Sequence, residues 1–203
     1  ALFGINFSCY YLLLLGNFRS VFKDEELRLY VGIILGATAL IVLNLRDFYP
    51  TLEETVRHAA FQVGSIITTT GFATTDFDLW PELSKNILVL LMFIGACAGS
   101  TGGGIKVSRI LILFKSLGKE LDMILHPRQV KKIKMDGHVV EHDTLRSVNV
   151  YMVSYVLIFM ASVVLLSFDD HSFTTNFTAV CASINNIGPG LEAVGPTQNY
   201  AFF

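Results

Sequence analysis

The chain alternates long apolar runs with short charged stretches. Apolar runs occupy residues 2–15, 29–45, 84–117 and 148–168, and most charged residues lie between them. A helix needs about 20 mainly apolar residues to cross the hydrocarbon core of a bilayer, and the later three runs approach or exceed that length. The pattern therefore predicts an all-α membrane protein.

Two shorter apolar segments follow sequences that are typical of helix starts. Residues 51–54, a threonine followed closely by two glutamates, predict an N-cap and a helix over 52–68. Residues 169–172 end in a serine of the same kind and predict a second helix over 172–184. Both helices are too short to span a bilayer. We interpret them as re-entrant half-helices, which enter the membrane and turn back.

A polar, glycine-centred tract follows each half-helix. Residues 68–75 contain five threonines around Gly71, and residues 185–190 read Asn-Asn-Ile-Gly-Pro-Gly around Gly188. The order of spanning run, half-helix and glycine tract thus occurs twice, with the two central glycines 117 residues apart. Recurrence at a fixed offset is typical of an internally repeated architecture.

The threonine tract has the composition of an ion-binding segment. Non-helical backbone at membrane depth is tolerated only where it lines a watery cavity or lies buried in protein. Carbonyl oxygens aimed into such a cavity can replace the water shell of a monovalent cation, and glycine permits the backbone angles this requires. The alternative is an ordinary threonine-rich turn. The tract around Gly188 is weaker evidence by itself, because Asn, Gly and Pro are common in turns.

The apolar run 84–117 is interrupted by a glycine-rich stretch. Four of the six residues 99–104 are glycines, and each costs a helix about 1 kcal/mol relative to alanine. We expect two half-helices separated by an intramembrane loop that constricts the pathway. A phosphate-binding loop is excluded because Ile105 separates Gly104 from Lys106. Lys106 and Arg109 are either functional intramembrane charges or side chains that reach the inner interface.

Composition and charge agree with a membrane protein and orient it. Mean hydropathy is +0.54 and charged residues make up 16% of the chain, against about 25% in soluble domains. Stretches 17–30 and 115–147 hold ten of the Lys and Arg residues, whereas the opposite side holds three. The positive-inside rule places the glycine tracts outside. Nine acidic residues on that outer side would concentrate cations at the mouth, although ordinary solvated loops explain any one of them. The three cysteines lie in apolar stretches and show no disulfide or zinc spacing.

Residues 118–147 are interpreted as a cytosolic connector. Within 126–143, Asp136-Gly137 between apolar-alternating arms (Val130, Ile133 and Met135, then Val139 and Val140) predicts a β-hairpin with a two-residue turn. The hairpin could dock a soluble partner, contact anionic lipid or serve only as a connector. His138 and His142 fall on an expected strand, which argues against a metal site.

Three motifs carry a family resemblance. Residues 68–76 (TTTGFATTD), 95–106 (GACAGSTGGGIK) and 185–191 (NNIGPGL) resemble the membrane subunit of Trk/Ktr-type potassium uptake systems, the TrkH type most closely, and the likeness covers essentially the whole chain. In that family four pseudo-repeats, each an outer helix, a re-entrant pore helix, a filter and an inner helix as in potassium channels, surround one potassium pathway. Catalysis and covalently bound cofactors are not implied, and potassium is the substrate.

The resemblance divides the chain as follows. Residues 1–16 match the end of a preceding inner helix, and 118–147 the cytosolic connector. One repeat occupies 17–117, with outer helix 29–46, pore helix 52–68, filter 69–75 and broken inner helix 84–117. A further repeat without its inner helix occupies 148–203, with outer helix 148–168, pore helix 172–184 and filter 185–190.

The resemblance also implies the site residues. The implied filter residues are Thr69, Thr70, Gly71 and Phe72 in one strand and Asn186, Ile187, Gly188 and Pro189 in the other. Potassium would be bound by the backbone carbonyls of Thr69, Thr70, Gly71, Asn186, Ile187 and Gly188. The implied gating-loop residues are Gly99, Ser100, Thr101, Gly102, Gly103, Gly104 and Lys106.

Partners and location follow from the same resemblance. It implies a multi-pass protein of the bacterial cytoplasmic (inner) membrane, in contact with lipid, homodimeric at full length and not bound to nucleic acid. A cytosolic nucleotide-binding regulatory subunit, similar to TrkA or KtrA, would dock on surfaces such as residues 115–147. Potassium against sodium selectivity, and channel-like against coupled transport, stay open at this stage.

Two other functions compete with an ion pore. A secondary transporter built on re-entrant hairpins would couple a monovalent cation to a solute, and carboxylates within the spanning runs, which the sequence lacks, would favour it. A membrane-embedded hydrolase would need a nucleophile with a base, or metal ligands, at membrane depth. His58 and His171 are isolated in sequence near the outer face, so the hydrolase is the weakest alternative.

Overall fold

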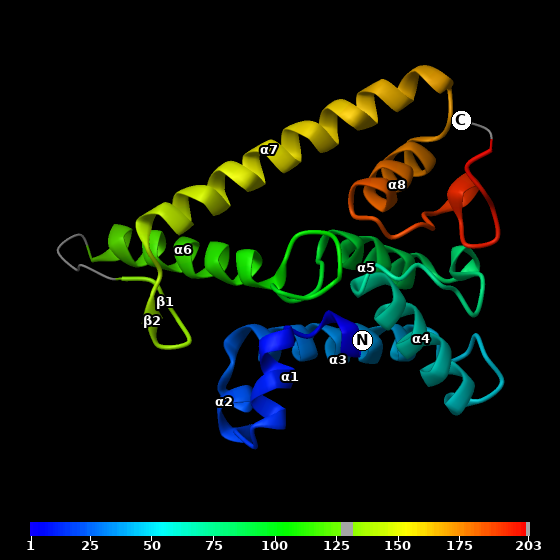
Figure 1. Cartoon of the computed structure of the whole chain (residues 1–203). Helices are drawn as coiled ribbons and strands as arrows, with labels where there is room; N and C mark the ends of the chain where they lie inside the picture. The colour runs from blue at the N-terminus through cyan, green and yellow to red at the C-terminus, as the bar shows by residue number, and fades with distance from the viewer. Residues whose placement is uncertain (127–131, 202–203) are drawn as a thin grey trace.

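The structure, a computed structural model, describes residues 1–126 and 132–201. The described residues form mostly helices, arranged in the order shown in Figure 1. The α-helices are α1 (Phe7–Leu14), α2 (Phe18–Lys23), α3 (Glu25–Asn44), α4 (Leu52–Ile67), α5 (Glu82–Phe93), α6 (Val107–Leu125), α7 (His142–Leu166) and α8 (Phe173–Ile184). Short 3-10 turns lie at Leu2–Gly4, Phe77–Leu79, Ser167–Asp169 and Glu192–Val194, and strands at β1 (Lys134–Met135) and β2 (His138–Val139).

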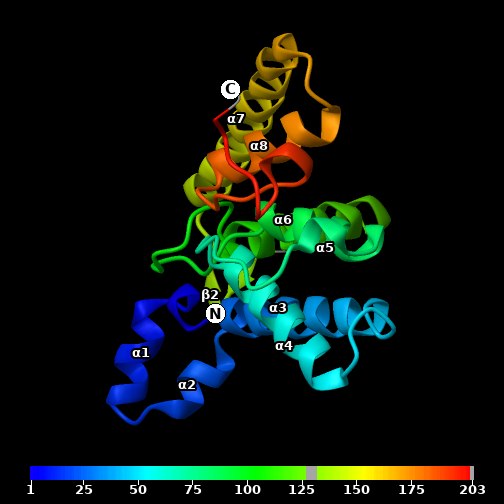
Figure 2. The ribbon, with the colours of Figure 1, turned by 90° about the vertical axis from the view of Figure 1, so that its right-hand side faces the viewer.

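The helices form two groups joined by a central loop. In the first, α3 packs on both α4 and α5; in the second, α7 packs on α8, and α5 contacts α8 across the two groups. Residues 94–106, which we call the glycine loop, connect α5 to α6 and lie between the groups in Figures 1 and 2. The short helices α4 and α8 both run from the right-hand side of Figure 1 towards this central region.

Side-chain caps fix the starts of five of the described α-helices, among them α3, α4 and α8. Asp24 accepts a hydrogen bond from the backbone N–H of Leu27 at the start of α3 (2.7 Å). Thr51 caps α4 in the same way (3.2 Å), and Ser172 caps α8 (3.1 Å). Each cap satisfies one of the N–H groups that a helix leaves unpaired in its first turn. The helix starts predicted from residues 51–54 and 169–172 are therefore confirmed, with Thr51 and Ser172 as the capping residues.

The core lies where α3, α4 and α5 meet. Its largest fully buried side chains include Trp80, Tyr30, Phe77, Ile41 and Leu88. Outside this core the apolar surface is extensive: among the described residues, α3 and the helix from His142 to Asp169 are long and apolar enough to cross a membrane, and only 22% and 11% of their apolar windows are buried. Such surface is what a helix facing lipid or a further helix requires.

Several helix boundaries differ from the sequence interpretation. The segment 1–16 is a 3-10 turn followed by the short helix α1, and its assignment to the end of a preceding inner helix stays a prediction. Much of the charged stretch 17–28 is helical, because Asp24 starts α3 with two glutamates in its first turn. Likewise α6 runs on to Leu125 and α7 begins at His142, so the connector between them is shorter than 118–147.

The predicted hairpin turn is confirmed. Lys134 pairs with Val139 and Met135 with His138, and the turn residues Asp136 and Gly137 have φ of 49° and 83°. Positive φ at both central residues defines a turn that matches the twist of paired strands. Val130, assigned to the first arm, lies outside the described residues.

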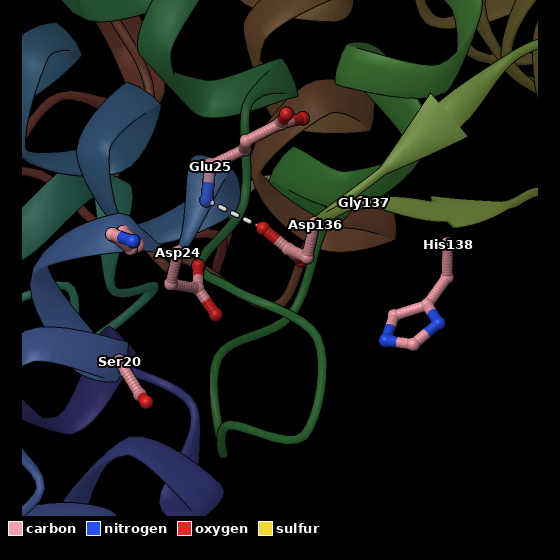
Figure 3. Close-up of a pocket in the computed structure, with 7 residues that line it drawn as sticks. Ser20, Asp24, Glu25, Asp136, Gly137 and His138 are labelled. Atoms are coloured by element: carbon pink, nitrogen blue, oxygen red, sulfur yellow. Dashed lines mark hydrogen bonds between the residues drawn. The ribbon is translucent and has the colours of Figure 1, made fainter.

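The hairpin contacts the start of α3. The Asp136 carboxylate accepts a hydrogen bond from the backbone N–H of Glu25 (2.9 Å), as Figure 3 shows. Lys115 of α6 pairs with the Glu25 carboxylate and donates to the Lys134 carbonyl (2.7 Å). The hairpin, α6 and the first turn of α3 are thus tied together at one end of the fold.

Candidate functional site

The two short helices end in the same way. At the end of α4, Thr69 has φ of 53°, and at the end of α8, Asn186 has φ of 60°. In both cases the left-handed residue follows the C-cap and closes the helix with the hydrogen bonds of a Schellman motif. The N–H groups of Thr68, Thr69 and Thr70 donate to the carbonyls of Gly64, Ile66 and Ser65, and those of Asn185, Asn186 and Ile187 donate to Cys181, Ser183 and Ala182. Every member of one set lies 117 residues from its counterpart.

Both central glycines have a positive φ. Gly71 has φ of 77° and Gly188 has φ of 113°, values that L-residues with a side chain rarely adopt. The predicted turning points are therefore true features of the backbone. We call residues 68–75 the Gly71 segment and residues 185–190 the Gly188 segment.

The two segments lie against each other. A Cβ atom placed on Gly71 would be 1.9 Å from the carbonyl oxygen of Ile187 and 3.3 Å from the Cδ of Pro189, so only a glycine allows this approach. A Cβ on Gly188 would meet nothing within 4 Å. Two segments more than a hundred residues apart in sequence are thus in direct contact. The contact is tight at Gly71, whereas there is free space where a Cβ would stand on Gly188.

Each segment borders a pocket. The pocket beside the Gly188 segment is lined by Ala182, Ser183, Asn186, Ile187, Gly188 and Tyr200. The pocket beside the Gly71 segment includes Ser65, Thr68, Thr70 and Phe72 in its lining. Residues of both segments therefore border open space, and the lining beside the Gly71 segment is mostly apolar.

Two of the backbone carbonyls already have side-chain partners. The hydroxyl of Ser65 donates to the Phe72 carbonyl (2.6 Å), and the hydroxyl of Tyr200 donates to the Gly188 carbonyl (2.6 Å). A carbonyl oxygen has two lone pairs, so each can accept one further contact. Gly188 was predicted as a potassium ligand, and the structure adds a tyrosine to its surroundings that the sequence did not reveal.

The glycine loop lies against both segments. The backbone N–H of Gly103 donates to the hydroxyl of Thr69 (2.8 Å), and a Cβ on Gly103 would lie 2.3 Å from the Asn185 carbonyl oxygen. A Cβ on Gly102 would lie 3.6 Å from the Thr68 carbonyl oxygen. The glycines thus let the loop approach both segments closely.

The loop closes on itself at its base. Ile94 and Ile105 form a parallel β-bridge, in which the backbone N–H of Gly95 donates to the Ile105 carbonyl (2.7 Å). Next to it, the backbone N–H of Val107 donates to the Ala96 carbonyl (3.2 Å). α5 and α6 are therefore separate helices, because this base replaces helical hydrogen bonds with cross-loop ones. The break predicted from the four glycines is present, between Phe93 and Val107.

Polar side chains satisfy part of the loop backbone. The ammonium group of Lys106 donates to the carbonyls of Gly102 and Ser100, and the Ser100 hydroxyl donates to the Cys97 carbonyl (2.5 Å). Lys106 therefore turns back onto the loop. Arg109 lies over the ring of Tyr151 on α7, with its guanidinium carbon 4.0 Å from the ring centroid, so its charge contacts a neighbouring helix.

A group of aromatic residues supports the far end of the Gly71 segment. The Tyr49 hydroxyl bonds to that of Thr75 (3.0 Å) and accepts from the indole N–H of Trp80 (3.0 Å). His58 stacks on Tyr49 and its Nδ1 bonds to the Thr74 hydroxyl (3.1 Å). His58 is thus part of this support, not an isolated histidine. Sequence reasoning missed the group because its members come from three separate segments; the Trp80-Pro81 turn after the tract was the available signal.

The structure offers no competing metal centre among its described residues. No group of three or more His, Cys, Asp or Glu side chains there could hold a metal ion, and Cys9, Cys97 and Cys181 are free and buried. A polar pocket at the hairpin end, shown in Figure 3, is lined by Ser20, Lys23, Asp24, Glu25, Asp136, Gly137 and His138. These side chains include both signs of charge and belong to the hairpin contact described above.

Comparison with known proteins identifies the family. A family model described as TrkH, a cation transport protein, matches residues 33–202. The chain belongs to the TrkH family. The potassium uptake protein TrkH of Salmonella typhimurium is 37% identical over 204 residues, which cover 98% of this chain and 41% of the relative. TrkH of Escherichia coli K12 is 37% identical over 197 residues, and TrkG of the same organism is 33% identical over 194 residues.

A solved TrkH structure has the same fold. The crystal structure of the potassium transporter TrkH from Vibrio parahaemolyticus superposes with a TM-score of 0.87 at 34% identity, covering 95% of this chain and 42% of that protein. This chain therefore spans about two fifths of the length of its TrkH relatives. The relatives are transport proteins and not enzymes, which confirms the class inferred from the sequence.

Proposed function

We propose that this chain forms part of a potassium uptake pore in which the Gly71 and Gly188 segments supply two strands of a selectivity filter. Thr69, Thr70 and Gly71 would bind potassium through their backbone carbonyls, as would Asn186, Ile187 and Gly188, with Phe72 and Pro189 completing the strands. The contact of Gly71 with Ile187 carries the proposal, because it brings together the two equivalent, non-helical segments that follow α4 and α8. We take potassium as the ion because the TrkH relatives are named as potassium uptake proteins.

Electrostatics fit a cation. Both α4 and α8 point their C-terminal ends towards the segments, and a helix C-terminus carries partial negative charge. Backbone carbonyls add partial negative charges without a carboxylate that would hold the ion too firmly. The further filter strands would come from the parts of the relatives that this chain does not span.

The glycine loop is proposed as the gate. Gly99, Ser100, Thr101, Gly102, Gly103, Gly104 and Lys106 would together obstruct the pathway below the filter. The hydrogen bond from Gly103 to Thr69 supports this role, because it fixes the loop directly against a filter strand. Shortening the loop within 99–104 should raise potassium flux.

The proposed setting is the bacterial cytoplasmic membrane, crossed several times, with lipid around the exposed apolar faces of α3 and α7. The full-length protein would form a homodimer. A cytosolic nucleotide-binding subunit of the TrkA or KtrA type would dock near the hairpin and the adjacent end of α6.

Ion uptake by the full-length protein in liposomes tests the proposal. We expect rubidium tracer uptake that potassium suppresses and sodium at the same concentration does not; protein-free liposomes are the control. Uptake that needs a gradient of an organic solute would instead support a secondary transporter. Equal suppression by potassium and sodium would contradict the selectivity filter.

A further inference from the structure

One buried carboxylate bonds both to the glycine loop and to the start of α6. Glu26 lies in the first turn of α3 and is 3% exposed. Its Oε1 atom accepts hydrogen bonds from the backbone N–H of Ala98 (2.7 Å) and from that of Ser108 (2.8 Å). Ala98 lies in the loop just before Gly99, and Ser108 lies in the first turn of α6, so a single oxygen atom of α3 links the loop to the helix that follows it.

The bond to Ser108 also completes a helix. The N-cap of α6, Lys106, provides no side-chain hydrogen bond, so the first N–H groups of α6 lack the usual cap. Glu26 supplies the acceptor from α3 instead, and its negative charge is favourable at a helix N-terminus. The start of α6 and the exit of the loop therefore depend on the same side chain.

Burial makes this arrangement demanding. A carboxylate removed from water is costly unless hydrogen bonds compensate it, and bonds to a charged acceptor are stronger than those between neutral groups. Ser108 belongs to α6, whereas the bond from Ala98 is kept only while the loop holds its present position. Movement of the loop would leave the carboxylate with fewer donors, so the charge opposes that movement.

The neighbouring glutamate provides a contrast. Glu25 lies in the same helical turn, but its carboxylate pairs with Lys115 and its backbone N–H donates to Asp136 of the hairpin (2.9 Å; Figure 3). Neither of these contacts involves the glycine loop. Substitutions of Glu25 and Glu26 can therefore be compared to distinguish a general effect on α3 from a specific effect on the loop.

We propose that Glu26 is the positioning residue that fastens the glycine loop at Ala98 to the start of α6 at Ser108 and so keeps the pathway closed. The inference rests on the gating role proposed above for that loop. It assigns to α3, outside the filter and the loop themselves, the contact that sets how readily the gate moves.

Two native cysteines make loop movement measurable without added cysteines: Cys97 reports the loop position, and Cys181 is the control for unfolding. Cys97 adjoins Ala98 within the loop and is 1% exposed, whereas Cys181 lies in α8 and is 0% exposed. A small polar thiol reagent should label neither in the wild-type protein. Release of the loop exposes Cys97 alone, while general unfolding exposes both.

The experiment uses the full-length protein in liposomes and compares Glu26→Ala, Glu26→Gln and the matched control Glu25→Gln. We expect Glu26→Ala to raise both the labelling rate of Cys97 and the potassium flux by about tenfold, which corresponds to the loss of the one charged hydrogen bond that holds the loop, from Ala98. Glu26→Gln keeps a neutral acceptor and should fall between Glu26→Ala and wild type. Glu25→Gln should match wild type, and Cys181 should stay unlabelled throughout.

The outcomes separate the inference from the proposed function. Unchanged Cys97 labelling in both Glu26 variants would overturn the role of Glu26. Faster labelling with unchanged flux would uphold that role and contradict gating by the loop. If Glu26→Ala does not fold, Glu26→Gln decides the question, since labelling equal to that of Glu25→Gln counts against the proposal.

Discussion

Replacing Gly71 by alanine tests the contact on which the proposed filter depends. The new Cβ would stand 1.9 Å from the Ile187 carbonyl oxygen, so that oxygen must retreat by about 1 Å to reach the 3.0 Å that real Cβ contacts respect. The φ of 77° adds a second penalty, because an L-residue in the left-handed region costs about 1–2 kcal/mol. Alanine at this position therefore displaces a proposed ion ligand and strains the strand that carries it.

Gly188→Ala is the matched control. Gly188 also has positive φ, 113°, but an added Cβ meets nothing within 4 Å. The control thus carries backbone strain without the clash, and overpacking alone typically costs about 1–3 kcal/mol. Gly71→Ala should therefore lose about 1–3 kcal/mol more stability than Gly188→Ala. If the substitution destabilises the ion-bound state by about 1.4 kcal/mol relative to the ion-free state, potassium affinity drops about tenfold.

The assay is rubidium uptake into liposomes by the full-length protein, with potassium and sodium as competitors, together with thermal unfolding in detergent. We expect Gly71→Ala to lower the preference for potassium markedly and Gly188→Ala to change it less. A Gly188 variant as damaging as the Gly71 variant would refute the reasoning from the Gly71–Ile187 contact. Unchanged potassium preference in Gly71→Ser would remove Gly71 from the filter.

Three further predictions concern contacts around the filter. Thr69→Val leaves the Gly103 N–H without its acceptor, at about 1–3 kcal/mol, and should raise basal flux, whereas Thr69→Ser should not; equal flux would argue against the contact. Tyr49→Phe removes the acceptor of the Trp80 indole N–H and should lower the thermal unfolding temperature, measured against wild type. The hydrogen bond from the N-cap serine of α8 holds the pKa of Glu192 below its usual 4.5. Its stabilisation is therefore full above that value and lost as pH falls through the lowered pKa, and Glu192→Gln should flatten this part of the pH–stability profile.

Local signals predicted the parts of the site that depend on local chemistry. Helices α4 and α8 follow from a threonine or serine cap at the start and a polar, glycine-containing tract at the end. Gly71 and Gly188 could be selected as turning points because glycine alone adopts such backbone angles without cost. These features need no knowledge of what lies beside them, so one sequence is enough.

Long-range contacts were beyond such signals. Glu26 was assigned to a charged inner stretch, since nothing in its spacing connects it with Ala98, 72 residues away. The cap at Asp24, followed by two acids, was nevertheless a readable helix start that would have placed Glu26 in α3. The predicted end of the inner helix at residue 117 was also too early. Gly118 lies inside α6, because a single glycine costs a helix only about 1 kcal/mol and does not end it.

The two helix ends share hydrogen bonds but not residues, and this difference has a consequence. Asn186 tolerates the left-handed conformation well, whereas Thr69, a β-branched residue, does so at a cost. The Thr69 hydroxyl accepts a hydrogen bond from Gly103, which offsets part of that cost only while the glycine loop is in place. Asn186 needs no such compensation, because its own side chain already suits the left-handed conformation. Displacement of the loop should therefore relax the Gly71 segment before the Gly188 segment, so that the proposed gate and the proposed filter would be coupled through the Gly71 segment.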